Sequence, residues 1–158
     1  MAWDEGLTTY DFGAQHPMAP IRVELTMALS RELGVFDGPG VDLIDVEPAS
    51  DELLSLVHDP AYIKAVKRAG KTLQPDDTHL LGTVDNPVFP DMHDAAALIS
   101  GASVAAAESV WTGRSAHAAN IAGGLHHAMR GHAWGFCVYN DPALAIAWLL
   151  EQGAKRIA

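Results

Sequence analysis

The chain has 158 residues, of which 49% are hydrophobic and 19% charged, a balance typical of one globular domain rather than a disordered segment. Its formal net charge of −10 argues against binding to nucleic acid, which requires clustered lysine and arginine. The single cysteine, Cys137, excludes a disulfide within the chain and indicates a reducing compartment, so we expect a cytoplasmic location. We find neither a secretion leader nor an apolar run approaching ~20 residues, and expect no membrane partner.

Five helices are predicted from apolar residues at helical spacing and from the residues that cap them. Pro20 suits the first turn of the first helix, Ser50 caps the second, and Asp59 caps the third with Pro60 at its first position. Asp141 is predicted to cap the last. In chain order, the predicted helices cover residues 21–33, 51–57, 60–69, 91–111 and 142–152.

Strands are predicted at residues 41–46 and 117–122, and residues 155–158 resemble the first residues of another. Alternation of strands with helices predicts an α/β fold with three layers, in which a parallel sheet carries helices on both faces. Residues 71–90 show little periodicity and predict a long surface loop of the kind that often carries function.

Two helices carry compositions that predict burial. The helix over 91–111 is rich in alanine, serine and glycine, and such small residues let neighbouring backbones approach closely. The last helix has no polar residue from Ala143 to Leu150, which predicts that most of its sides are covered.

Two adjacent histidines, His126 and His127, follow a glycine pair at the end of the predicted strand 117–122. Ligands of open α/β sheets bind beyond the carboxyl ends of strands, which is where this loop should lie. Imidazole titrates near neutral pH and carries protons in either direction, so the pair could divide acid and base roles. Cys137 follows at short distance after the Gly135-Phe136 dipeptide.

Several blocks together resemble the zinc-dependent histone deacetylase family, and within it the bacterial acetoin-utilisation-type deacetylases. They are the His-Pro-Met-x-Pro-x-Arg block, a Tyr-Ile helix start, an Asp before Asn-Pro-Val-Phe, the Gly-Gly-Leu-His-His-Ala loop and the Gly-Phe-Cys to Asn-Asp segment, at residues 16–22, 57–63, 85–89, 123–128 and 135–141. The similarity implies an arginase/deacetylase-like fold and hydrolysis of acetyl-lysine.

The resemblance implies a role for each residue of these blocks. His126 and His127 would sit at the base of a tunnel for acyl-lysine, one taking a proton from the attacking water and the other protonating the leaving amine. Phe136 would line the tunnel, the Gly135 carbonyl would accept from the substrate amide, and Asp85 would accept backbone N–H bonds of a peptide at the rim. The residues expected to border an internal cavity for departing acetate are Arg22, Leu125 and Cys137.

Each role has a plain structural alternative that the sequence leaves open. Phe136 could be ordinary core, Asp85 could simply form a turn, and Arg22 could make an external salt bridge. Cys137 could be a small buried apolar side chain. The other six histidines are interpreted as structural or exposed, namely His16, His58, His79, His93, His117 and His132.

No spacing of His, Cys, Asp or Glu predicts a metal site in this chain. The resemblance implies Zn²⁺ for the complete protein, with ligands and orienting aspartates in later segments. We therefore expect residues 1–158 to be the N-terminal part of one deacetylase domain, ending before the metal-ligand strand, inactive alone and able to self-associate through an open sheet edge. Two alternatives remain: a deacylase of small acetylated amines such as polyamines, and a non-catalytic fold that binds an acyl ligand or a partner.

Overall fold

The computed structural model describes residues 1–158 and confirms all five predicted helices. They are α1 (Ile21–Glu32), α2 (Asp51–Leu54), α3 (Pro60–Thr72), α4 (Met92–Trp111) and α5 (Asp141–Glu151). Two short 3₁₀ turns, η1 (Glu5–Thr8) and η2 (Asp77–His79), were not predicted. None of these helices combines the length and the hydropathy of a membrane-spanning segment.

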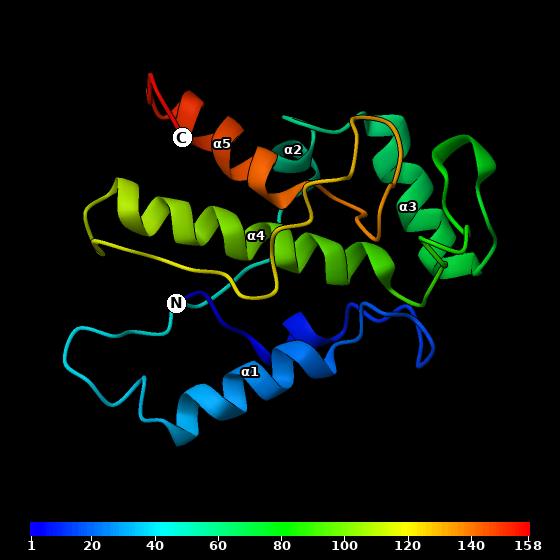
Figure 1. Cartoon of the computed structure of the whole chain (residues 1–158). Helices are drawn as coiled ribbons and strands as arrows, with labels where there is room; N and C mark the ends of the chain where they lie inside the picture. Colours follow the sequence, from blue (N-terminus) through cyan, green and yellow to red (C-terminus); the bar gives the residue numbers. More distant parts are fainter.

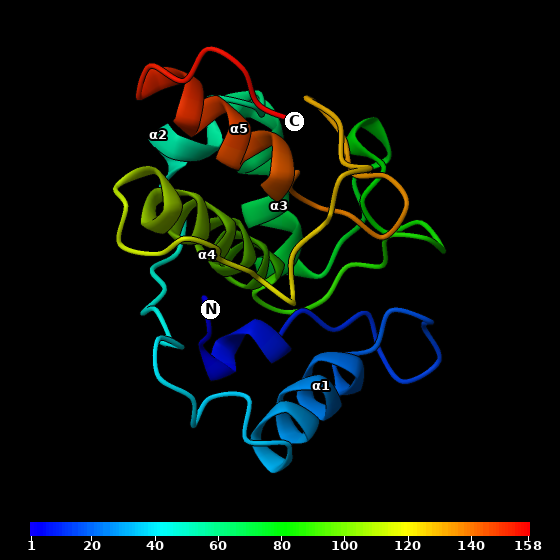
Figure 2. The same cartoon turned by 60° about the vertical axis from the view of Figure 1, so that its left-hand side comes forward.

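Helix α4 runs through the middle of the molecule (Figure 1). Helices α3 and α5 pack on it from one side, and α2 lies against both of them. On the other side η1 separates α4 from α1, as Figure 2 also shows. Helix α1 is therefore attached to the rest of the fold mainly through the N-terminal segment.

The small residues of α4 allow close approach, as predicted. A Cβ at Gly101 would lie only 1.8 Å from the carbonyl oxygen of Glu47, so only glycine fits there. The backbone N–H of Ala49 donates to the Ala97 carbonyl at 2.9 Å. Gly70, predicted to follow α3, instead lies inside it, where a side chain would crowd the backbone nitrogen of Met92 at 3.0 Å.

The predicted strands 41–46 and 117–122 do not form. Ala2 lies between the two segments, donating its N–H to Ala119 O at 3.0 Å and making a single parallel bridge to Ile44. Residues 155–158 also form no strand. A strand needs a neighbour along its whole length, and here each segment meets the three-residue N-terminus alone or no partner at all. Of the predicted sheet, only the placement of the N-terminus between the two segments is present.

Two helices leave an apolar face uncovered. Helix α1 buries Val23 and Met27. The apolar residues at helical spacing that predicted this helix face outward instead, with exposed fractions of 50, 60, 60 and 71% at Ile21, Leu25, Leu29 and Leu33. Helix α5 was expected to be covered on most sides, and this is wrong for the described chain. Of its apolar residues only Leu144 is fully buried, and Ile146 and Leu150 are 43 and 53% exposed.

Candidate active site

The loop that carries the two histidines is fastened to the start of α5. The Asp141 carboxylate accepts from the backbone N–H groups of Gly124 at 3.0 Å and Leu125 at 2.7 Å. Asp141 was expected to cap α5, but the structure assigns the cap to Asn140, whose side chain accepts from Ala143 N at 3.0 Å. The Asn140 amide nitrogen also donates to the carbonyls of His126 and Ala128, both at 3.0 Å.

The structure brings the rings of His126 and His127 together, with centroids 4.3 Å apart and planes inclined at 44°. His126 Nδ1 lies 2.9 Å from the Gly124 carbonyl oxygen. Because a carbonyl can only accept, we assign the ring hydrogen to Nδ1, which leaves Nε2 with a free lone pair. Both side chains are exposed in the described chain.

A tight turn holds Gly135 and Phe136 beside the histidine pair. Trp134 and Cys137 form an antiparallel bridge, and both residues between them have positive φ, 53° at Gly135 and 70° at Phe136. Positive φ at both central positions is the signature of a type I′ turn. His127 packs against this turn, because a Cβ at Gly135 would lie 3.0 Å from His127 Cγ.

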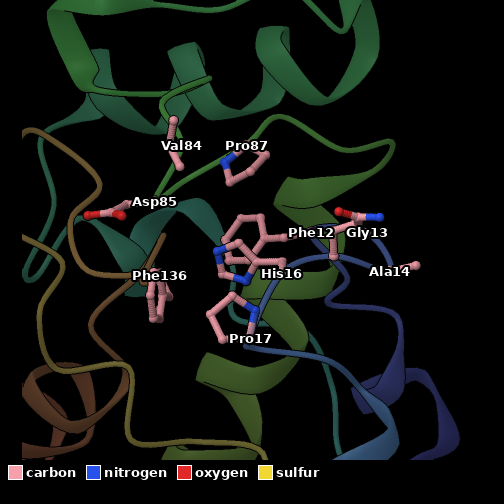
Figure 3. Close-up of a pocket in the computed structure, with 10 residues that line it drawn as sticks. Phe12, Gly13, Ala14, His16, Pro17, Val84, Asp85, Pro87 and Phe136 are labelled. Atoms are coloured by element: carbon pink, nitrogen blue, oxygen red, sulfur yellow. The ribbon is translucent and has the colours of Figure 1, made fainter.

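Asp85 and Phe136 line one hollow of about 610 Å³. Figure 3 shows Val84 and Pro87 above it, with Phe136, His16 and Pro17 below. The Phe136 ring meets the His16 ring edge-on, with centroids 4.6 Å apart. Asp85 lies in a bend of the chain as well as beside the hollow, so the structure is compatible with both the turn and the substrate-binding interpretation. His126 and His127 do not line this hollow.

The three residues expected around an acetate cavity do not share the cavity that Arg22 borders. Arg22 borders a small cavity of about 20 Å³ with Tyr10, Met18 and other residues, but neither Leu125 nor Cys137 lines it. Leu125 and Cys137 are both buried. Burial raises the pKa of the Cys137 thiol, which opposes formation of a thiolate. Arg22 makes no salt bridge in the described chain.

His58 holds two segments of the site together through hydrogen bonds. Its position in the sequence did not reveal this role. It is fully buried, and its Nδ1 lies 3.0 Å from the Met129 carbonyl while its Nε2 accepts from Asn140 N–H at 3.0 Å. It therefore joins the loop after the histidine pair to the segment after the Phe136 turn. The sequence does show a histidine beside the Tyr-Ile helix. It does not show the partners of that histidine, because both are backbone groups far away along the chain.

The described residues contain no group of three or more His, Cys, Asp or Glu side chains that could hold a metal. The donors of this chain therefore do not fit a zinc site by themselves. His126 and His127 offer two imidazoles, whereas a zinc site needs at least three protein ligands.

Comparison with known proteins shows which family shares this sequence. The sequence profile of the histone deacetylase domain matches residues 16–158. The chain belongs to the histone deacetylase family. It is 45% identical to the acetoin utilization protein AcuC of Bacillus subtilis (strain 168) over 152 residues, which cover 94% of this chain and 39% of that protein. The AcuC protein of Staphylococcus xylosus is 32% identical over 154 residues, covering 96% of this chain and 40% of the relative.

Solved structures confirm the predicted fold class. An HDAC homolog from Aquifex aeolicus superposes with a TM-score of 0.84 at 31% identity, covering 98% of this chain and 42% of that one. An HDAC homolog complexed with SAHA gives 0.81 at 32% identity, covering 94% and 40%. The chain therefore has the arginase/deacetylase-like α/β fold of its family, and it spans about two-fifths of the length of these relatives.

Proposed function

We propose that the whole protein is a lysine deacetylase that hydrolyses the side-chain amide of acetyl-lysine in a protein or peptide. The observation that carries the proposal is the contact of the His126 and His127 rings, whose centroids are 4.3 Å apart. His127 also packs on the Gly135–Phe136 turn, which borders the hollow. Family membership supports deacetylation. The mostly apolar surface of the hollow suits an aliphatic lysine stem.

In this proposal the histidines move protons and the turn binds substrate. His126 Nε2 has the free lone pair needed to take a proton from water, whose oxygen then bonds to the acetyl carbon. His127 is assigned the proton that the lysine amine receives as the C–N bond breaks and acetate departs. Phe136 packs on the lysine stem, the Gly135 carbonyl accepts from the substrate amide, and Asp85 accepts from the peptide backbone at the rim.

Zinc enters the proposal as the cofactor of the whole protein, where it would activate water and polarise the carbonyl. Its ligands would come from outside the described residues, because these form no metal cluster. For the same reason we propose that residues 1–158 by themselves bind no zinc tightly and do not deacetylate. Turnover together with a one-to-one zinc site in this chain would contradict that part.

The test compares His126→Ala and His127→Ala with His117→Ala, an exposed histidine outside the site, in the whole protein. Loss of a positioned acid or base should lower kcat for an acetyl-lysine peptide by roughly 10²- to 10⁴-fold, with zinc content unchanged. Near-parental turnover in either site variant would refute the assignment. Faster hydrolysis of an acetylated polyamine than of the peptide would favour the small-amine alternative, and binding without turnover would favour a non-catalytic fold.

A further inference from the structure

The segment from Phe136 to Asn140 starts in a turn, continues through bends and belongs to no sheet. Several of its backbone polar groups are satisfied by buried side chains from distant parts of the chain. Tyr62 donates its hydroxyl to Val138 O at 2.7 Å, and His58 accepts from Asn140 N–H at 3.0 Å. A third side chain, Tyr10, acts at the turn itself.

The Tyr10 hydroxyl makes two hydrogen bonds to the backbone at the end of the turn. It donates to the carbonyl oxygen of Phe136 at 2.9 Å and accepts from the backbone N–H of Val138 at 3.0 Å. Tyr10 is 4% exposed, so water offers these groups no ready substitute. Burial raises the pKa of Tyr10 well above its ordinary value, and the hydroxyl therefore keeps its proton as a donor.

The Tyr10 ring is itself held by aromatic packing. It meets Phe12 and Phe89 edge-on, with centroids 5.2 and 5.3 Å apart, and those two rings meet each other at 5.4 Å. Phe12 lines the same hollow as Phe136. One rigid cluster therefore joins the N-terminal wall of the hollow to the turn on its other side.

Phe136 needs such an anchor because its backbone is unfavourable for a large side chain. A φ of 70° is the left-handed region, which glycine occupies freely and an aromatic residue rarely adopts. Such a conformation persists only where surrounding contacts impose it. The two bonds from Tyr10 fix the peptide groups on both sides of Cys137.

We propose that Tyr10 is a positioning residue for substrate binding: through its two hydrogen bonds it holds the Gly135–Phe136 turn so that the Phe136 ring grips the acyl-lysine stem. The inference rests on the proposed function, since it assigns Phe136 a wall of the acyl-lysine site. Tyr10 itself touches no reacting atom.

The test uses Tyr10→Phe in the whole protein, which removes one oxygen and keeps the aromatic packing. The matched control is Tyr62→Phe, which removes one buried hydrogen bond from Val138 O but none from the turn. Binding of a fluorescent acetyl-lysine peptide is measured by anisotropy, so the result does not depend on turnover. We expect Tyr10→Phe to weaken binding roughly ten-fold, and Tyr62→Phe to leave it within about two-fold.

A double-mutant cycle separates positioning from general loss of stability. In a Phe136→Ala background, Tyr10→Phe should change peptide affinity by less than about two-fold, because the ring that it positions is gone. An equal loss in both backgrounds, or no loss in either, would overturn the proposal. Equal losses in Tyr10→Phe and Tyr62→Phe would also overturn it.

Amide hydrogen exchange gives a second readout that needs no substrate. The Val138 amide should exchange slowly in the parent protein and at least about ten-fold faster in Tyr10→Phe. Rapid exchange at Val138 in the parent, or an unchanged rate in the variant, would refute the anchoring without any binding data. A parent protein that binds no acetyl-lysine peptide would refute the proposed function, while the exchange rates would still decide whether Tyr10 fixes the turn.

Discussion

The carboxylate of Asp141 accepts a hydrogen bond from the backbone N–H of Leu125, with 2.7 Å between oxygen and nitrogen. The same carboxylate accepts from Gly124 N–H and from the Ser103 hydroxyl at 2.5 Å. Three donors therefore converge on one buried side chain, and burial raises the pKa of Asp141 above its ordinary value in spite of them. This residue fixes the loop that leads into the histidine pair.

Asp141→Asn should destabilise the protein, because an amide nitrogen replaces one accepting oxygen and leaves at least one buried donor unpaired. We expect the free energy of unfolding to fall by about 2 kcal/mol, measured by urea denaturation of the whole protein. Ser103→Ala removes one donor to Asp141 and one acceptor of Asn120 Nδ2, which keeps its bond to the Ile99 carbonyl, and should cost about 1 kcal/mol. If both substitutions cost the same, the backbone bonds to Asp141 contribute little.

Gly135→Ala should impair the site more than the fold. A residue with a Cβ at φ 53° is strained, and that Cβ would press on the His127 ring at 3.0 Å. We expect kcat of the whole protein for an acetyl-lysine peptide to fall at least ten-fold, roughly the effect of misplacing a catalytic group. Gly131→Ala is the control, because its Cβ would meet its nearest neighbour at an ordinary 3.5 Å. Similar kcat values in the two variants would contradict the contact.

Stability should fall as the pH is lowered through the range in which His58 gains a proton. Burial lowers the pKa of His58 from its ordinary 6.5, so the unfolded chain binds this proton more readily than the folded one. The stabilisation is therefore complete above pH 6.5 and is lost as the pH falls through the lower, folded pKa. Protonation of Nε2 would also remove the acceptor of the Asn140 N–H.

The measurement is the urea midpoint of the whole protein at about pH 8 and about pH 5, for the parent and for His58→Gln. Glutamine retains a donor and an acceptor but does not titrate, so the variant should lose less stability on acidification. His93 contributes in the same direction, because burial lowers its pKa as well. Identical pH dependence in parent and variant would show that His58 is not the group responsible.

Residues 1–158 produced alone should self-associate through the uncovered faces of α1 and α5. Burial of apolar surface yields about 25 cal/mol per Å², so a few hundred Å² amounts to several kcal/mol. Light scattering and binding of a dye specific for apolar surface should both be strong. The double variant Leu25→Glu/Leu29→Glu, which charges the outward stripe of α1, should reduce both signals. A cooperative melt of a monomer that binds no dye would contradict the prediction.

The sequence by itself determined what depends on neighbours along the chain. Ser50 accepts from Leu53 N at 3.2 Å as a cap should, Pro60 occupies the first turn of α3, and Gly153 follows α5 at a φ of 98°. Helix hydrogen bonds join residues four apart, so capping signals and periodicity suffice to find them. The paired histidines and the Gly-Phe-Cys turn were visible for the same reason, as contiguous blocks.

Only the tertiary structure decided which distant groups meet. The predicted strands 41–46 and 117–122 lack the neighbours that a ladder requires, and nothing in their own residues shows this. Tyr10 reaches Phe136 across 126 positions, and His58 reaches Asn140 across 82. Asp141 does not cap α5, because its carboxylate instead accepts from two backbone N–H groups of the histidine loop and from a serine of α4. Such bonds depend on how the elements pack against one another. Packing brings together residues at no fixed spacing along the chain, whereas helices and strands have regular periods that a sequence displays.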